Sequence, residues 1–184
     1  MHRDLKPENI LCKNNVIVKI CDFGSSKYID LTGKNTPYIV SRYYRAPELM
    51  FCITKYGPPI DIWATGCILA ELITRQPIFQ GKTESDQIGS IFTNIGTPTE
   101  SDYLELANLV PFDPNLFREF PVIPRYLVMQ QLDEMFRSVH DRKNLIDLLL
   151  KCFAYVPEQR ISAADAMNHK FFDSIRQEYK DLSL

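Results

Sequence analysis

The chain has 184 residues, 45% of them apolar and 24% charged, which is the composition of an ordinary globular domain with room for one core. Its 21 basic and 23 acidic residues give a formal net charge of −2, which gives no support to binding of nucleic acid or anionic membranes. No apolar run is long enough to span a bilayer, and the N-terminus lacks the apolar stretch of a signal peptide. We therefore expect an intracellular protein, in the cytoplasm and/or the nucleus, with no membrane or nucleic-acid partner.

The five cysteines are scattered along the chain, and none forms a C-x-x-C pair. An odd number without such spacing argues against a disulfide framework and against a zinc site. Most of them lie inside apolar runs, where a thiol behaves as a small hydrophobic group. The cysteines therefore indicate a reducing compartment.

The first predicted element is a β-hairpin. The stretch "ILCKNNVIVKIC" predicts one strand at residues 10–12, a turn at residues 13–15 and a second strand at residues 16–21, rich in β-branched residues. Residues 22–44 are polar, rich in Gly, Ser and Thr, and lack sustained periodicity. They predict a long surface loop, and loops of this length are usually functional or disordered.

The chain becomes helical after Pro59. Apolar residues with i, i+3, i+4 spacing predict a helix with much of its surface buried, built on Ile60, Trp63, Ala64, Cys67, Ile68 and Leu72. Ser85 is expected to cap the next helix, which should end at Ile95 because Gly96 and a nearby proline stop it.

Further helices are predicted at residues 100–109, 127–136 and 145–153. The stretch between residues 110 and 124 carries four prolines and should be irregular, although its phenylalanines suggest that it packs down. The sequence "SAAD" at residues 162–165 resembles a capping box that opens another helix. The last residues have the composition of a charged, frayed tail. With no internal repeat and no linker, we expect one mostly helical unit with a small hairpin.

The segment "HRDLKPEN" at residues 2–9 combines an acceptor, a cation and a neutral amide within a few positions. Its proline favours an extended backbone before it, so the segment is predicted to be a loop that leads into the first strand. The second strand ends at Asp22, which therefore returns beside Asn9. Asp4, Lys6, Asn9 and Asp22 can thus converge on one edge of the hairpin.

These residue types suit phosphoryl chemistry. Carboxylate and amide oxygens, here from Asp22 and Asn9, bind Mg²⁺ together with the phosphate oxygens of a nucleotide. Lys6 offers a point charge to a transferring phosphoryl group, and Asp4 offers a carboxylate that accepts or orients a hydroxyl proton. A solvated, capped turn beside a hairpin is the alternative interpretation, because short motifs also occur by chance.

Three motifs carry a family resemblance. "HRDLKPEN", "DFG" at residues 22–24 and "APE" at residues 46–48 resemble, in this order and spacing, the catalytic loop, magnesium loop and activation-segment end of eukaryotic protein kinases. The resemblance implies a protein-kinase-like large (C-terminal) lobe over residues 1–172, mostly α-helical with a small β-hairpin, and a C-terminal tail over residues 173–184. It also implies a protein serine/threonine kinase that uses ATP and Mg²⁺, since a lysine two residues after the aspartate is the serine/threonine form.

The resemblance assigns roles to single residues. Asp4 would be the catalytic base, Lys6 would contact the γ-phosphate, and Asn9 and Asp22 would hold magnesium. The floor of the adenine pocket would be lined by Leu11 and Cys21.

Two other positions are expected to be structural rather than catalytic. By the same resemblance, Glu48 forms an ion pair with Arg160 of "PEQR", which ties the activation segment to the last helices. Asp61 of "DIW" is expected to anchor the backbone of the catalytic loop from below.

The stretch "YIVSRYYRAPELMF" at residues 38–51 resembles the CMGC group of kinases, and most of all its shaggy, or glycogen synthase kinase, family. Leu5 and Glu8 depart from that family's common "HRDIKPQN" and have the general CMGC form. Tyr38 occupies the position of the family's activation-loop phosphotyrosine. We expect its phosphate to pair with Arg42 or Arg45, and the alternative is an unmodified loop tyrosine.

Substrate recognition is also implied by the resemblance. Arg3 and Lys27 are the basic residues expected at a phosphate pocket, where they would receive a primed phosphoprotein or would only tether this chain's own loop. Ser41 and Arg45 would help to position the protein substrate.

The 184 residues contain no glycine-rich phosphate loop, no strand lysine of the "VAIK" type and no hinge. We therefore expect the small N-terminal lobe to be absent and the sequence to begin within a kinase domain, as a truncated sequence or a genuine short product would. These residues alone should be inactive or nearly so. Two other functions stay open: a non-catalytic lobe that binds substrates or scaffolds, and a small-molecule phosphotransferase, against which the "APE" segment argues.

Overall fold

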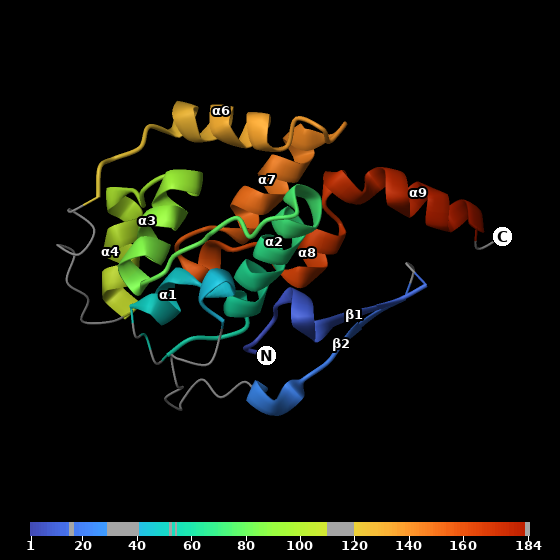
Figure 1. The fold of residues 1–184 in the computed structure, drawn as a ribbon, viewed down its shortest axis with the longest axis horizontal. Coiled ribbons are helices and arrows are strands. Elements are labelled where there is room, and N and C mark those ends of the chain that lie inside the picture. Colours follow the sequence, from blue (N-terminus) through green and yellow to red (C-terminus); the bar gives the residue numbers. More distant parts are fainter. Residues whose placement is uncertain (15–16, 29–40, 52, 54, 110–119, 183–184) are drawn as a thin grey trace.

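The computed structural model describes residues 1–14, 17–28, 41–51, 53, 55–109 and 120–182 of the chain. Most of the described chain is helical, and a two-stranded hairpin projects from one edge, beside the N-terminus (Figure 1). Helix α2 (Pro59–Thr74) lies in the middle of the helices. This arrangement confirms the expected mostly helical unit with a small hairpin.

The hairpin consists of β1 (Ile10–Lys13) and β2 (Ile17–Ile20), which run antiparallel with Ile10 opposite Ile20. A 3-10 turn at Pro7–Asn9 precedes β1 and begins with the proline, whose fixed φ suits the entry to a helical turn. The predicted hairpin is confirmed. Its register brings the loop at residues 2–9 and the residues after β2 to the same end.

The stretch between the hairpin and α2 contains short helical turns. A 3-10 turn at Phe23–Ser25 follows β2, and a second one at Arg42–Tyr44 leads into the short helix α1 (Pro47–Met50). All four residues of α1 are buried. The long polar stretch is thus held at both of its described ends.

Helix α2 crosses α7 (Arg142–Cys152) at Gly66. A β-carbon at Gly66 would lie 2.8 Å from Cβ of Cys152 and 2.8 Å from Cε1 of Phe153, so only glycine allows the two helices to approach this closely. Beside this crossing, the fully buried Trp63 stacks on Phe79 and meets Phe153 edge-to-face, with ring centroids 5.5 and 5.1 Å away. Aromatic pairs in these geometries contribute beyond their buried area.

The predicted helix over residues 60–72 is confirmed, but one of its predicted core positions is wrong. Leu72 is 65% exposed, whereas Ile60, Trp63 and Cys67 are buried. Leu72 lies in the last turn of α2 and borders a surface hollow with Pro7. Periodicity places a residue on a face of the helix, but it does not tell how far along the helix that face stays covered.

Helix α3 (Glu84–Ile95) begins two residues earlier than predicted. Its N-cap is Thr83, not Ser85: the Thr83 hydroxyl accepts a hydrogen bond from the Asp86 amide at 3.1 Å, and the Asp86 carboxylate accepts one from the Thr83 amide at 3.0 Å. This reciprocal capping box satisfies two amides, whereas Ser85 lies inside the first turn. The helix ends at Ile95, as predicted, before Gly96 with its positive φ of 89°.

Four further helices complete the described chain. They are α4 (Glu100–Leu109), α6 (Arg125–Met135), α8 (Ala163–Met167) and α9 (Asp173–Leu182). The predicted cap of α8 is confirmed, since the Ser162 hydroxyl accepts a hydrogen bond from the Asp165 amide at 3.0 Å. The described residues 120–124 are irregular, as predicted, and Phe120 packs edge-to-face on Phe92 with centroids 5.1 Å apart.

The expectation of a frayed tail after residue 172 is wrong for the described residues. They form α9, which extends away from the other helices (Figure 1). The guanidinium of Arg176 bonds the Asp173 carboxylate and the carbonyl of Met167, which ties the first turn to the end of α8. Charged residues spaced three positions apart stabilise a helix in this way.

The described cysteines are free thiols: Cys12, Cys21, Cys67 and Cys152. Burial raises the pKa of the Cys67 thiol well above its ordinary value, which suits a packing role. Among the described helices, none is both long and apolar enough to cross a membrane.

Candidate active site

The carboxylate of Asp4 is the meeting point of the loop at residues 2–9. Its Oδ2 accepts a hydrogen bond from the Lys6 ammonium at 2.8 Å, and the Asn9 side-chain nitrogen lies 3.4 Å from the same oxygen. The Oδ1 atom faces the backbone amide of Ser41 at 3.4 Å. Asp4 is 8% exposed. Three of the four residues predicted to converge are therefore in direct contact, and Ser41 joins them from a distant part of the chain.

Asp61 fixes the backbone that carries Asp4. Its two carboxylate oxygens accept hydrogen bonds from the amides of His2 at 2.7 Å and Arg3 at 2.8 Å. Arg3 has a positive φ of 73°, a conformation that costs a residue with a side chain ~1–3 kcal/mol. The paired amides hold this strained turn, so the anchoring role predicted for Asp61 is confirmed.

Asn9 and Asp22 lie next to each other through the hairpin. The carbonyl of Asn9 accepts the Cys21 amide at 3.0 Å, which brings the residue after Cys21 to the loop. The Asn9 side-chain nitrogen donates to the Asp4 carbonyl at 2.8 Å, and its side-chain oxygen accepts no hydrogen bond from a described residue, so it is available to a ligand. Asp22 is exposed, has a positive φ of 59°, and uses one carboxylate oxygen to accept the Gly24 amide at 3.2 Å.

Electrostatics link Lys6 to this group. The pKa of Lys6 is raised, first by its hydrogen bond to Asp4 and further by the negative charges of Asp4, Glu8 and Asp22, against the opposing effect of burial. The ammonium therefore stays charged, and the Asp22 carboxylate is near enough to act on it. The ammonium can bind a phosphate while the carboxylates face a metal ion, so this arrangement can accept a phosphate and a metal ion together.

The donor set fits magnesium. Among the described residues there is no cluster of three or more His, Cys, Asp or Glu side chains that would form an all-protein metal cage. Mg²⁺ does not need one, because it usually takes one or two protein oxygens and completes its shell with phosphate and water. The amide oxygen of Asn9 and the second carboxylate oxygen of Asp22 are the atoms that match this use.

A second set of contacts holds the segment that ends at "APE". The Glu48 carboxylate accepts two hydrogen bonds from the Arg160 guanidinium, each 2.6 Å long, and both side chains are essentially unexposed. The predicted Glu48–Arg160 ion pair is therefore confirmed. Its guanidinium also lies 5.1 Å from the centroid of the Trp63 ring, which joins the segment to the core of α2.

Comparisons with known proteins agree with this geometry. Residues 1–172 match the family model described as "Protein kinase domain". The chain belongs to the protein kinase domain family. Similar proteins include "Glycogen synthase kinase 1" of Pyricularia oryzae, 41% identical over 180 residues, and "Protein kinase gsk3" of Schizosaccharomyces pombe, 43% identical over 178 residues. "Mitogen-activated protein kinase 10" of Arabidopsis thaliana is 38% identical over 174 residues.

Each of these alignments covers 95% of this chain but only 42%, 43% and 42% of the three relatives. The chain thus spans less than half the length of the curated kinases that it matches. Both kinds of relative, glycogen synthase kinases and mitogen-activated protein kinases, agree with the CMGC resemblance.

Two contacts of this kinase segment were not predicted from the sequence. The Tyr44 hydroxyl donates to the Glu71 carboxylate at 2.7 Å, and the buried Arg45 pairs with Glu84 at 2.9 Å. Burial, followed by the bond to Glu71, strongly raises the pKa of Tyr44. The sequence signal that could have indicated the Arg45 contact is Glu84, an acidic residue in the first turn of α3. The contact ties Arg45 to α3, and its role in substrate positioning stays a prediction.

The two residues of the predicted phosphate pocket lie on chain segments that are hydrogen-bonded to each other. Met1 and Lys27 exchange two backbone hydrogen bonds of 3.2 and 3.1 Å, which places Lys27 next to the loop that carries Arg3. The Arg3 guanidinium donates to the Ser25 carbonyl at 2.5 Å and to the Tyr56 hydroxyl at 3.4 Å. These contacts tether the start of the activation segment. Tyr38, the predicted phosphorylation site, lies outside the described residues.

The predicted floor of the adenine pocket lies on the hairpin. Leu11 is in β1 and is 54% exposed, and Cys21 follows β2 and is partly buried. The Cys21 thiol donates to the Asn9 carbonyl at 3.5 Å. Both residues are therefore near the Asn9 end of the site, and their contact with adenine stays a prediction.

Proposed function

We propose that these residues form the large-lobe half of the active site of a protein serine/threonine kinase that transfers the γ-phosphate of ATP to protein hydroxyls. The single observation that carries the proposal is the Asp4 carboxylate, which is buried, bonded to Lys6 and Asn9, and next to the Ser41 amide. A carboxylate held in this way can accept the proton of an attacking hydroxyl, while Lys6 neutralises charge on the transferring group.

Magnesium and ATP are the proposed cofactors. Asn9 and Asp22 would hold the metal, which when bound neutralises charge on the phosphates. The residues of this chain orient the reaction: Asp61 fixes the loop backbone, and Lys6 keeps its charge through the contact with Asp4. Phosphoryl transfer demands positioning more than covalent chemistry, so this backbone support belongs to the proposed mechanism.

Protein substrates, including primed phosphoproteins, are the proposed partners. The backbone bonds between Met1 and Lys27, which keep the segments of Arg3 and Lys27 adjacent, support a phosphate-binding pocket, since both side chains can donate to phosphate oxygens. The bond from Arg3 to the Ser25 carbonyl supports the alternative, in which the pair only tethers the activation segment. A primed and an unprimed peptide would be compared as substrates of the parent and of an Arg3→Lys variant. Only a phosphate site discriminates between the two peptides, so a preference for the primed peptide that changes in the variant separates the two uses.

The test of catalysis needs a complete domain. We would place the part of the Schizosaccharomyces pombe relative that precedes its matching segment in front of residue 1 and measure γ-phosphate transfer to a serine peptide. Asp4→Asn should lower kcat by at least ~10²–10⁴, the contribution of a general base. Glu158→Gln, at an exposed position far from Asp4 in the sequence, is the matched control and should leave kcat unchanged. Equal rates for Asp4→Asn and the parent would reject the proposal.

A binding module without catalysis is the second candidate function. It is favoured by the apolar side chains that the hairpin and the turn after it expose, with Ile17 at 50%, Val18 at 62% and Phe23 at 64%. Exposed apolar patches of this kind mark interaction surfaces. An active chimera that depends on Asp4 would leave this second function without support.

A further inference from the structure

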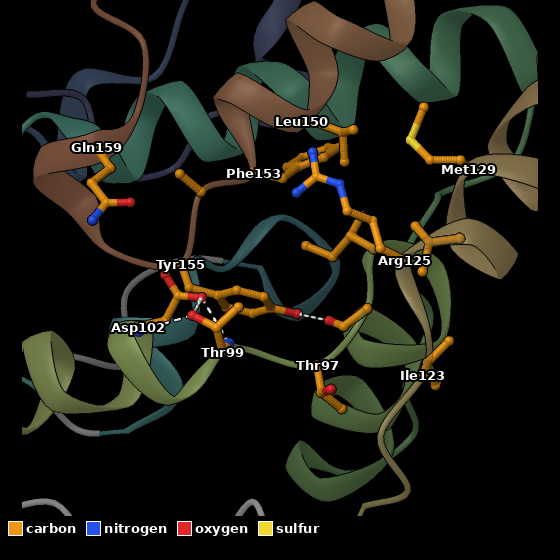
Figure 2. A pocket seen from close by; sticks show the side chains of 14 residues that line it. Thr97, Thr99, Asp102, Ile123, Arg125, Met129, Leu150, Phe153, Tyr155 and Gln159 are labelled. Carbon is orange, nitrogen blue, oxygen red and sulfur yellow. Dashed lines mark hydrogen bonds between the residues drawn. The ribbon is translucent and has the colours of Figure 1, made fainter.

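A cavity of about 270 Å³ lies between the ends of α3, α4, α6 and α7 (Figure 2). Its walls include Thr97, Asp102, Arg125, Val128, Leu150 and Phe153. None of these residues belongs to the candidate active site. A cavity of about 150 Å³ suffices to bind benzene, so this one has room for a ring with a short substituent.

Arg125, which is exposed, supplies the positive charge of the cavity. It makes no hydrogen bond or ion pair with any residue that the structure describes, and its guanidinium lies beside Phe153 and below Leu150 in Figure 2. Arg125 is also the first residue of α6, whose first turn has no acidic residue. A cation is unfavourable at the positive end of a helix dipole, so its placement does not serve the helix. An anion bound here would gain from the guanidinium.

The opposite wall carries a negative charge that is already used. Asp102 and Thr99 lie across the cavity from Arg125 in Figure 2. The Asp102 Oδ2 atom accepts hydrogen bonds from the amide and the hydroxyl of Thr99, both 2.7 Å long. This carboxylate would repel a second negative charge on a ligand, so an anionic group is admitted only at the Arg125 end.

The wall between these two charges is apolar. Its accessible surface comes from Ile123 and Leu150, which are partly buried, and from Met129, which is 39% exposed, whereas Val128 and Phe153 are already covered, with 2% and 3% exposed. The Tyr155 hydroxyl donates to the Gly96 carbonyl, so this phenol forms a wall with its polar atom already satisfied. A ligand that fills this part of the cavity therefore needs an apolar body rather than hydrogen-bonding groups.

We propose that this cavity binds a small organic monocarboxylate, with its carboxylate on Arg125 and a ring-sized apolar body against Ile123, Met129 and Leu150. The site is independent of the proposed kinase chemistry, because it shares no residue with the Asp4 group. A dianion is disfavoured by Asp102, and a purely inorganic anion leaves the apolar wall uncovered.

Saturation-transfer NMR of the 184-residue chain with 3-phenylpropanoate tests the proposal. We expect binding in the millimolar range or tighter, with transfer to the ring protons. Arg125→Gln should weaken binding by at least about tenfold, since it removes a charge-assisted hydrogen bond. Arg137→Gln is the matched control: Arg137 is exposed in the turn after α6, it pairs with Glu134, and its loss should leave the affinity unchanged.

Two further probes fix the chemical class. The methyl ester of the same acid should bind at least about tenfold more weakly, because it lacks the charge. Inorganic phosphate should not displace the acid at equal concentration. The proposal is overturned if the acid does not bind, if Arg125→Gln binds it as well as the parent, or if the ester or phosphate competes equally.

Discussion

Two ion pairs of this chain use the same chemistry in different surroundings. In Glu48–Arg160 the guanidinium makes two bonds of 2.6 Å to the carboxylate, both side chains are unexposed, and Arg160 also donates to the carbonyls of Ala154, Pro59 and Tyr155. In Asp4–Lys6 a single bond of 2.8 Å joins side chains that are 12% and 23% exposed.

The difference separates a structural pair from a functional one. All the donors of Arg160 have protein acceptors, so the pair has no capacity for a further ligand. Lys6 and Asp4 keep donors and lone pairs that a phosphate or a hydroxyl can use, and the charges around Lys6 hold it in its protonated form. A saturated buried pair costs much to break, whereas an unsaturated pair at an open end can change partners.

The largest expected effect concerns the Asp4–Lys6 pair and the residues around it. We predict that the 184-residue chain alone transfers phosphate several orders of magnitude more slowly than whole kinases, although Asp4, Lys6, Asn9 and Asp22 are all present. The 184 residues contain no glycine-rich loop and no strand lysine, and positioning is worth ~7–11 kcal/mol of a reaction barrier. The exposed apolar side chains of the hairpin should also make the isolated chain prone to aggregate.

The measurement is γ-phosphate transfer to a serine peptide by the purified chain, beside an Asp22→Asn variant. Residual activity that the substitution abolishes would belong to this site, and activity that survives it would come from a contaminant. A soluble monomer that turns over at ordinary kinase rates would contradict the prediction.

The next effect concerns the buried Glu48–Arg160 pair. Glu48→Gln should lower the free energy of unfolding by ~3–5 kcal/mol, because it leaves the Arg160 guanidinium buried without its countercharge. Urea unfolding followed by the fluorescence of Trp63, against which Arg160 packs, is a direct measurement.

The matched control is an ion pair of the same chemistry at the surface. Glu134→Gln breaks the bond to Arg137, but these side chains are 71% and 76% exposed, so no measurable change is expected. The double substitution Glu48→Gln with Arg160→Met should recover part of the lost stability, because the buried charge is gone. Equal losses from Glu48→Gln and Glu134→Gln would refute the distinction between the two kinds of pair.

The sequence predicted the elements whose signals are local. The β-branched stretch gave the hairpin, and the periodicity after Pro59 gave α2. It failed where tertiary surroundings decide. Ser85 and Thr83 are both capable caps, and only the backbone conformation at Thr83 selects it. Leu72 shares the spacing of the buried positions but lies in the uncovered last turn of α2.

The sequence predicted those contacts of the candidate site that join residues close in the sequence or brought together by the hairpin. Asp4, Lys6 and Asn9 are close in sequence, and the hairpin returns Asp22 to them. The contact of Asp4 with Ser41, 37 residues away, and that of Arg45 with Glu84, 39 residues away, depend on how the activation segment folds back. No local pattern determines such long-range pairings.

A smaller effect tests Asp61, which holds the backbone of the loop that carries Asp4 and Lys6. Asp61→Ala removes the acceptors of the His2 and Arg3 amides and should lower the free energy of unfolding by ~2–3 kcal/mol, the desolvation cost of unsatisfied amides. Hydrogen exchange should show faster exchange of the His2 and Arg3 amides in particular. Thr65→Ala, one turn along the same helix at an exposed position, is the control and should leave both amides protected. Unchanged protection in Asp61→Ala would show that the loop has another anchor.

The smallest effect concerns a half-exposed cluster that belongs to neither pair. Asp147 accepts hydrogen bonds from Lys151 at 2.7 Å and from His169 at 2.9 Å, and the Lys151 bond, with a smaller contribution from His169, lowers its pKa below the ordinary 3.8. A lowered folded-state pKa contributes stability that is fully present above the ordinary value of 3.8 and is lost as the pH falls from there through the lower folded-state pKa. Asp147→Asn should therefore flatten the acid limb of the unfolding free energy below about pH 5. Because the Asp147 side chain is 53% exposed, solvent screening should keep the change below about 1 kcal/mol.

The control is Glu158→Gln, at a position that is exposed in the same region of the sequence, and it should keep the parent's acid limb. An Asp147→Asn curve that coincides with the parent's curve would show that the cluster contributes no pH dependence.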